Sequence, residues 1–391
     1  MFKEREILTS LQPFFNSPEA VFITGMRRTG KTTLLKYLYT KYESKNKLFM
    51  DLENPINRKY FESDNYEKIK SSLEILGLDF NANKIAIFLD EIQYFKSLPS
   101  IVKYFIDTYK VKFYLTGPIH YYSRKQFDES LAGRKVIFDL YPLTFREFLR
   151  FKGKKLNPPT SNNGSISKPI FDVLSTMFEE YILFGGFPEV VLKKTIEEKK
   201  HALEDIFASF FKFEVVQFSS YRKSEAIRDL MLLLMKKSCQ RIDIQKISHE
   251  LNISRATTYE YLRFLEDSYF IKTIRPFQSN HALEIRKAAR VYICDSGLIN
   301  QFTRVPEEYL FQNAVFQNLQ AKGTLQYYER KSGAGIHFIV EENKGFHVVL
   351  HPSRSDLQRI KRLASEINLD DFSLLAKHYS DFEEVDYAFM I

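Results

Sequence analysis

A phosphate-binding loop of the form G-x-x-x-x-G-K-T, at residues 25–32, constrains this chain more than any other feature. The apolar run over residues 20–23 predicts a buried strand before the loop, and apolar positions at helical spacing after Thr33 predict a helix behind it. In that order, Gly25 and Gly30 can turn the backbone and present N–H groups to phosphate oxygens. A chance glycine loop between a strand and a helix is the alternative interpretation.

The residue types in the loop predict their roles. We expect Lys31 to reach the β- and γ-phosphates of a nucleotide, and the Thr32 hydroxyl to ligate a magnesium ion that bridges them. The residues that we expect to bind the nucleotide are Gly25, Arg28, Thr29, Gly30, Lys31, Thr32 and Thr33. The sequence contains no guanine-specific N-K-x-D motif, so the predicted cofactors are ATP and magnesium.

A second apolar strand, over residues 84–89, ends in two adjacent carboxylates, Asp90 and Glu91. A buried parallel strand would deliver Asp90 beside Thr32, where it can hold magnesium through water. Glu91 is then placed to polarise the attacking water, which favours hydrolysis over simple binding. The alternative is that the two acids merely cap a strand.

Two further residues are candidates for catalysis. Thr116 ends the strand over residues 111–115 and is suited either to sense the γ-phosphate and orient the water or simply to close the strand. Arg134 precedes a strand over residues 136–140, and we consider it as a finger that stabilises transition-state charge, supplied in cis or by a neighbouring subunit. A surface arginine after a turn is the alternative.

Five motifs occur in an order that resembles the prokaryotic AAA-type ATPases. They are GMRRTGKTT (residues 25–33), LDEIQ (89–93), LTG (115–117), LAGR (131–134) and YPLTFREF (141–148). More narrowly, the chain is similar to a family with an N-terminal AAA core and a C-terminal domain called DUF4143. The resemblance implies a parallel sheet of the ASCE type, in which another strand separates the acid-bearing strand from the phosphate-loop strand. It also implies that the chain forms homo-oligomers. The family usually has Thr-Gly-Ser where this chain has Thr-Gly-Pro at residues 116–118.

Composition excludes several other classes of protein. A chain of 391 residues with 44% hydrophobic residues can form two to four globular domains, and its net charge of +8 permits a polyanionic partner without requiring one. The two cysteines have no metal-binding spacing, which predicts reduced thiols. The charged N-terminus is unlike a signal peptide, and no run approaches the ~18 apolar residues of a membrane span. We therefore expect a cytoplasmic protein without membrane contact.

The predicted fold class is α/β, with a parallel P-loop core of the ASCE/AAA type followed by smaller domains. A polar stretch rich in Pro, Gly and Asn predicts a linker, and a Gly-Gly-x-Pro break at residues 185–188 predicts either the joint of lid helices or a plain helix–helix turn. The predicted domains are a P-loop ATPase core (1–152), a linker (153–170), a helical lid (171–228), a winged helix-turn-helix (229–294) and a degenerate restriction-nuclease-like α/β domain (295–391).

A helix-turn-helix is predicted over residues 244–266, with Ser254 as the N-cap of its second helix. We place Tyr259, Leu262 and Leu265 on the buried side of that helix. Alternating apolar residues at 269–274 and 289–294 predict the strands of a wing, whose loop carries His281, Arg286, Lys287 and Arg290. Duplex DNA would then meet Arg255, Thr257, Thr258 and Arg263. An adaptor between subunits is the alternative.

The last domain resembles restriction nucleases in scaffold, after a D-S-G-L motif at residues 295–298. The positions that carry acids and a lysine in such nucleases hold Gln312, His337, Val349 and His351 here. Without an acidic cluster the metal has no hard-oxygen site, so we expect no nuclease activity. A zinc site from His337, His347 and His351 is an alternative that we rank below a role in packing or binding.

These observations predict a magnesium-dependent ATPase that acts on DNA or is regulated by it through the winged helix. The proposed catalytic residues are Lys31, Glu91, Thr116 and Arg134, and the magnesium ligands are Thr32 and Asp90. The alternative function is a nucleotide-gated interaction switch with slow hydrolysis and no DNA binding.

Overall fold

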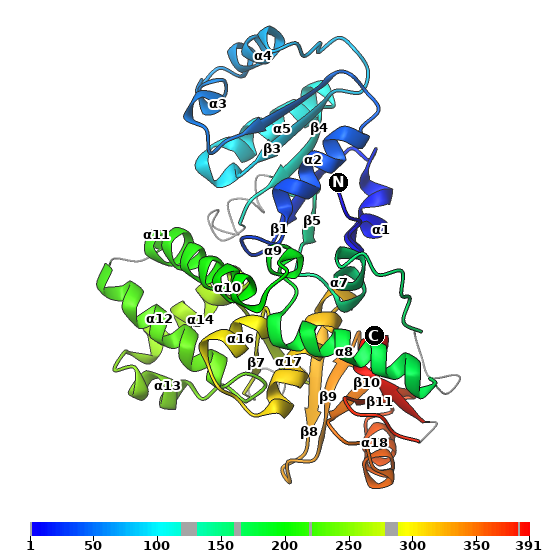
Figure 1. Ribbon diagram of the computed structural model, residues 1–391. Helices are drawn as coiled ribbons and strands as arrows, with labels where there is room; N and C mark the ends of the chain where they lie inside the picture. Colours follow the sequence, from blue (N-terminus) through cyan, green and yellow to red (C-terminus); the bar gives the residue numbers. More distant parts are fainter. Residues whose placement is uncertain (1, 119–130, 160–165, 219–220, 278–287, 382–383) are drawn as a thin grey trace. The chain divides into compact units, whose positions relative to one another are not determined.

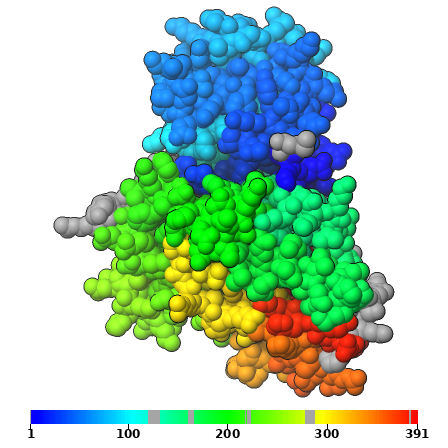
Figure 2. Space-filling model, in the orientation of Figure 1, coloured from blue at the N-terminus to red at the C-terminus, as the bar shows by residue number. Residues whose placement is uncertain are grey.

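The computed structural model describes the whole chain except residues 1, 119–130, 160–165, 219–220, 278–287 and 382–383. It divides the chain into two compact units, Met1–Tyr141 and Pro142–Ile391. The first unit is blue to cyan in Figures 1 and 2, and the second is green to red. No helix among the described residues is both long enough and apolar enough to cross a membrane.

The first unit is built on a five-stranded parallel sheet in the order β2-β3-β4-β1-β5. Its strands are β1 (Ala20–Thr24), β2 (Lys47–Asp51), β3 (Ala86–Asp90), β4 (Lys112–Thr116) and β5 (Lys135–Asp139). Every position of β1, β3 and β4 is buried, as expected of a parallel sheet covered on both faces. The predicted α/β P-loop core is confirmed, and β4 separates the acid-bearing strand from the phosphate-loop strand.

Helix α2 (Lys31–Lys41) packs on this sheet through Leu34, Leu35 and Leu38. The N-terminal segment packs against the same core, and its helix α1 (Ile7–Leu11) is short because it gives way to a 3-10 turn that contains Pro13. Proline has no backbone N–H to continue the helical ladder. The remaining helices of this unit are α3 (Pro55–Lys59), α4 (Tyr66–Ile75) and α5 (Leu98–Tyr109).

The second unit combines helices with a seven-stranded mixed sheet in the order β12-β11-β10-β9-β8-β6-β7. Its strands are β6 (Ile271–Pro276), β7 (Arg290–Ile293), β8 (Leu325–Glu329), β9 (Gly335–Val340), β10 (Lys344–Val349), β11 (Asp371–Ala376) and β12 (Val385–Tyr387). Its main helices are α7 (Phe145–Phe151), α8 (Lys168–Phe184), α9 (Pro188–Leu192), α10 (Ile196–Phe210), α12 (Tyr221–Lys236), α13 (Ile244–Glu250), α14 (Arg255–Asp267), α16 (Ser296–Phe302), α17 (Glu307–Leu319) and α18 (Arg354–Glu366).

The strands predicted for a wing, β6 and β7, do pair antiparallel, from Ile271 with Ile293 to Ile274 with Arg290. Strand β6 also pairs parallel with β8. The two predicted wing strands, β6 and β7, therefore belong to the same sheet as β8 to β12 of the C-terminal part. The five-part division of the chain stays a prediction.

Helix α17 carries four buried amide side chains that join the parts of the second unit. Asn313 bonds both the N–H and the carbonyl of Ile293, and it accepts a hydrogen bond from Ser238. Gln317 accepts from the N–H of Ser296, while Asn318 accepts from the N–H of Phe145. The fourth, Gln312, donates to the hydroxyl of Tyr292 at 3.0 Å. Each amide is therefore satisfied inside the core, as buried polar groups must be.

The buried carboxylate of Asp295 also connects parts of the second unit. It accepts hydrogen bonds from backbone N–H groups of two glycine motifs, at residues 185–188 and 295–298. The N–H groups of Gly186 and Gly297 donate to it at 2.7 and 2.9 Å, and Gln317 donates at 3.1 Å. A Cβ on Gly185 would lie 1.8 Å from the carboxylate oxygen, so only glycine fits there. The Gly-Gly-x-Pro break between α8 and α9 is therefore a packed turn within the second unit.

The Asp295 carboxyl makes the stability of the second unit depend on pH. Burial raises its pKa to about 7 from 3.8, although its hydrogen-bond donors act in the opposite direction. The folded state then binds the extra proton, so its contribution is complete at low pH and is lost as the pH rises through about 7. At about 1.4 kcal/mol per pKa unit, the contribution of this carboxyl to the unfolding free energy should fall by on the order of 4 kcal/mol. Urea unfolding across this pH range should show the decline in wild type relative to Asp295→Asn, and the same pH dependence in both proteins would contradict it.

Candidate functional site

The phosphate loop between β1 and α2 depends on both of its glycines for its shape. Gly25 has a φ of 144°, and a Cβ there would lie 2.2 Å from the carbonyl oxygen of Leu140, the residue after β5. Gly30 has a φ of 98° and is the N-cap of α2. The chain before α2 therefore makes a left-handed turn against β5 that other residues would strain or block.

The ammonium group of Lys31 lies inside this loop. Only 6% of Lys31 is exposed, and its Nζ donates to the carbonyls of Gly25 and Met26 at 2.8 and 3.0 Å. The buried Thr29 hydroxyl also donates to the Met26 carbonyl, at 2.9 Å. The loop thus holds a positive charge among its own dipoles, where a bound phosphate would meet it.

The other predicted loop residues differ in exposure. Arg28 and Thr33 point their side chains to the surface, whereas Thr32 is half-buried at the first turn of α2. Arg28 itself has a left-handed backbone, with a φ of 67°. Contact of Arg28 or Thr33 with a nucleotide stays a prediction.

The acidic edge of the sheet is formed by the ends of β3 and β4. Asp90 is 2% exposed, and the buried hydroxyl of Thr116 donates to its Oδ1. The N–H of Glu91 donates in turn to the Thr116 hydroxyl at 3.4 Å. Thr116 therefore does more than close its strand, because it fixes the carboxylate of Asp90.

Glu91 lies within electrostatic reach of the phosphate loop. Burial raises the pKa of its carboxyl, and the charges of Lys31 and Arg27 and a hydrogen bond from Gln93 oppose that rise. Its backbone is left-handed, with a φ of 53°, which turns the chain sharply after β3. The buried ammonium of Lys31 and the half-buried carboxyl of Glu91 are thus close enough to interact electrostatically.

The donor set of this site suits magnesium and a triphosphate. Thr32 and Asp90 offer hard oxygen ligands, which Mg²⁺ prefers, and the cation usually takes its other ligands from water and phosphates. No cluster of three His, Cys, Asp or Glu side chains that could hold a metal occurs among the residues described. A metal that takes some of its ligands from the phosphates does not need three such protein side chains.

Arg134 is not part of this site within one chain. Its carbonyl accepts from the N–H of Ala20, just ahead of the first residue pair of β5 and β1, Lys135 and Ala20. The phosphate loop leaves the opposite end of β1, so the two lie at opposite edges of the sheet. Arg134 instead pairs with Asp107 at 2.6 Å. The prediction that Arg134 stabilises transition-state charge within its own chain is therefore wrong. That Arg134 does so at the site of a neighbouring copy stays a prediction.

The face predicted to contact DNA needs one correction. Thr258 is fully buried, and its hydroxyl donates to the Ser254 carbonyl, whereas Tyr259, which we expected inside, is 62% exposed. Arg255 and Arg263 are exposed one helical turn on either side of Tyr259. Thr257 is half-exposed at the Ser254 cap, and Arg263 lies 3.8 Å from Asp267.

A hollow of about 470 Å³ adjoins this face and is lined in part by Arg241, Gln245, Arg255 and Tyr259. The predicted wing residues His281, Arg286 and Lys287 lie outside the described residues. Arg290 is inside the fold and bonds Glu329 at 2.7 Å.

The nuclease-like positions hold no acidic cluster. The side chain of Gln312 donates a hydrogen bond to the Tyr292 hydroxyl. The rings of His337 and His347 are stacked, with their centroids 4.5 Å apart. His337 accepts from the N–H of Val348, and burial lowers the pKa of both histidines, that of His347 to about 4. His351 stacks on His378 instead. These contacts account for His337 and His347 as neutral packing residues.

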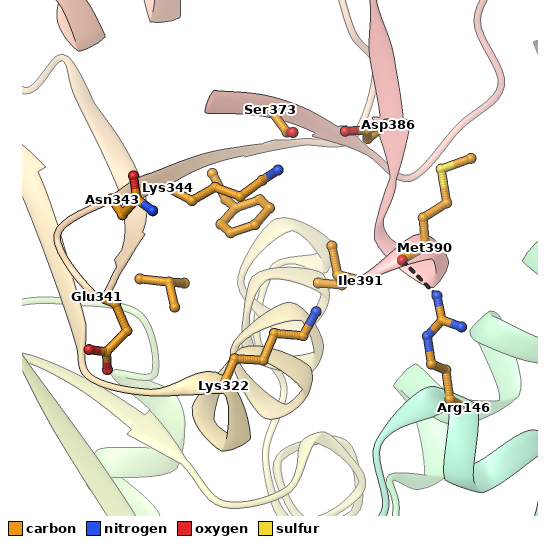
Figure 3. A pocket seen from close by; sticks show the side chains of 11 residues that line it. Arg146, Lys322, Glu341, Asn343, Lys344, Ser373, Asp386, Met390 and Ile391 are labelled. Atoms are coloured by element: carbon orange, nitrogen blue, oxygen red, sulfur yellow. Dashed lines mark hydrogen bonds between the residues drawn. The ribbon is translucent and has the colours of Figure 1, made fainter. Parts of the chain in front are cut away.

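A separate cavity of about 290 Å³ lies in the tail, between the turn of β9 and β10 and the last residues of the chain (Figure 3). Arg146 extends toward it and donates to the carbonyl of Met390, while Lys322 points toward Ile391. The positions compared with nuclease residues do not line this cavity.

Sequence reasoning missed three residues at the phosphate site. Arg27 acts on the pKa of Glu91, Gln93 donates to the Glu91 carboxylate, and Arg5 donates to the carbonyl of Thr29. Arg27 and Gln93 stand inside the quoted motifs, so their positions could have singled them out. Nothing in the local sequence around Arg5 indicates its contact.

Comparison with family models agrees with the geometry of the first unit. Residues 17–149 match a model described as an AAA domain. The first unit has the α/β fold of a P-loop core and is similar to AAA domains. Residues 175–309 match a domain of unknown function, DUF8612, so the expected likeness to DUF4143 is corrected.

Similar proteins extend over most of the chain. An uncharacterized protein of Methanocaldococcus jannaschii is 26% identical over 385 residues, which cover 93% of this chain and 83% of the relative. An uncharacterized protein of Haemophilus influenzae is also 26% identical, over 76% of this chain and 72% of its own length. A Walker-type ATPase of Pyrococcus abyssi has a solved structure that aligns with a TM-score of 0.42 at 14% identity, over 77% of this chain and 96% of that one.

Proposed function

We propose that this chain binds ATP with magnesium and hydrolyses it. The observation that carries the proposal is the electrostatic interaction of the buried Lys31 ammonium inside the glycine loop with the half-buried Glu91 carboxyl at the end of β3. A loop that served only to connect a strand and a helix would have no reason to bury a lysine opposite a glutamate, because buried charges are costly.

Each residue then has a distinct role. The loop N–H groups and Lys31 hold the phosphates, and Thr32 with Asp90 holds magnesium, whose charge stabilises the negative charge on the phosphoryl oxygens. Glu91 accepts the proton of the attacking water, and a raised pKa makes its carboxylate a stronger base. Thr116 keeps the Asp90 carboxylate oriented through its hydrogen bond.

Two substitutions test the proposal by separating binding from hydrolysis. Lys31→Ala should weaken nucleotide binding and abolish turnover, since it removes the charge inside the loop. Glu91→Gln should retain ATP binding but lose at least about 100-fold in kcat, because the amide cannot accept the proton. Phosphate release and binding of a fluorescent ATP analogue measure the two effects. Wild-type turnover in Lys31→Ala would contradict the proposal.

We further propose that the second unit binds duplex DNA through α14 and thereby regulates the ATPase. Arg255, Tyr259 and Arg263 recur every fourth residue, so they form one exposed stripe on this helix. Two cations on either side of an exposed aromatic ring suit phosphates and a base edge or sugar between them. At the adjoining hollow, Gln245 adds an amide and Arg241 adds a cation that pairs with Glu329 at 2.9 Å, while Asp243 adds an acid. Nearby acids such as Glu260 make an adaptor role the competing proposal.

Salt-dependent binding of a short duplex distinguishes these two roles. Arg255→Gln and Arg263→Gln should each lower the slope of log affinity against log salt concentration by about 1, because each removes a phosphate contact. Tyr259→Ala should weaken binding and leave that slope unchanged, because the ring carries no charge. Arg228→Gln, on the exposed part of α12, is the matched control. Absence of binding by wild type at about 50 mM salt would exclude DNA and favour the adaptor.

A further inference from the structure

Arg5 connects two distant parts of the first unit. Its guanidinium is buried, with only 6% of the residue exposed. Nη1 donates to the carbonyl of Thr29 in the phosphate loop at 2.8 Å, and Nη2 donates to the carbonyl of Tyr141 at 2.7 Å. Tyr141 is the last residue of the first unit. We propose that Arg5 positions the phosphate loop and couples its nucleotide state to the start of the second unit, an inference that rests on the proposed ATPase.

The contact with Thr29 determines where the next amide points. In a planar trans peptide the C=O and the following N–H point in opposite directions. A Thr29 carbonyl held on Arg5 therefore aims the N–H of Gly30 away from Arg5. The nearest heavy atom to a Cβ built on Gly30 is Nη1 of Arg5, at 3.9 Å, so the guanidinium lies beside Gly30. The N–H of Gly30 then points away from Arg5, and we place the phosphate on that opposite side.

The contact with Tyr141 extends this restraint toward the second unit. The loop already touches the preceding residue, because the N–H of Leu140 donates to the Thr24 carbonyl at 2.7 Å and Gly25 packs on the Leu140 carbonyl. Both ends of the loop thus hold the segment 140–141. Two residues later the N–H of Leu143 donates to the Gly186 carbonyl, and Thr144 caps α7. A shift of the phosphate loop would therefore be transmitted from residue 140 to the start of α7 through only four residues of chain.

Arginine suits this position because its planar fork offers several N–H donors in fixed directions, so one side chain can hold two carbonyls at once. A lysine ammonium is a compact group on a flexible stem and would favour one carbonyl over the other. Glutamine would lack both the charge and the reach. Arg5→Lys should therefore keep part of the effect, and Arg5→Gln should lose it.

Nucleotide affinity and hydrogen exchange together test the proposal on the full chain. In wild type, saturating magnesium with a non-hydrolysable ATP analogue should change the exchange of residues 139–148. In Arg5→Gln the Kd should rise about tenfold or more, and saturation should leave that segment unchanged. Arg5→Lys should lie between the two, and the exposed Arg228→Gln should behave as wild type. A lost stabilising contact alone would not remove the response of the segment at saturation.

Two results would overturn the inference. One is a wild-type Kd and a wild-type exchange response in Arg5→Gln. The other is saturation of wild type without any change at residues 139–148. If Arg5→Gln does not fold, Arg5→Lys decides, and wild-type behaviour there rejects the role of Arg5. Loss of turnover in Lys31→Ala alongside unchanged Arg5 variants would reject only this inference, whereas unchanged turnover in Lys31→Ala would reject the ATPase.

Discussion

The buried ammonium of Lys31, bonded to the carbonyls of Gly25 and Met26, is the interaction on which the first unit depends. A charge can remain buried only where dipoles or opposite charges compensate it. The glycine loop provides the dipoles, and Glu91 provides an opposite charge nearby. The order of the sheet makes this arrangement possible, because parallel strands β1, β4 and β3 all end at one edge. The loop is held there by Leu140 and Arg5.

In the second unit, hydrogen bonds from buried polar side chains connect the helices to one another and to the sheet. Asn313 and Gln317 of α17 bond the backbone of β7 and of α16, and Asp295 collects the N–H groups of Gly186 and Gly297. Unpaired, each group would destabilise the core, so their mutual bonding specifies how the helices and the sheet fit. The Gly-Gly-x-Pro and D-S-G-L motifs are thus two parts of one joint.

How far the sequence predicts the site depends on the range of each interaction. The succession of strand, loop and helix along the chain predicted Lys31 and the paired acids as site residues. The order of the strands within the sheet was predicted from a family resemblance. Thr258 was misplaced because an aromatic residue was preferred inside, although 258, 261, 262 and 265 share helical spacing. A threonine can be buried when its hydroxyl bonds the carbonyl four residues back, as here. Arg134 stands before its strand, which already puts it at the wrong edge. Arg5 could not be found, since its partners lie 24 and 136 residues away.

A crystal structure with magnesium and a non-hydrolysable ATP analogue tests the central claim most directly. The account predicts that Lys31 Nζ leaves the carbonyls of Gly25 and Met26 for the phosphates, with the metal between Thr32 and Asp90 and the γ-phosphate facing Glu91. A triphosphate bound elsewhere, or a Lys31 that keeps both carbonyls while the nucleotide is bound, would contradict it.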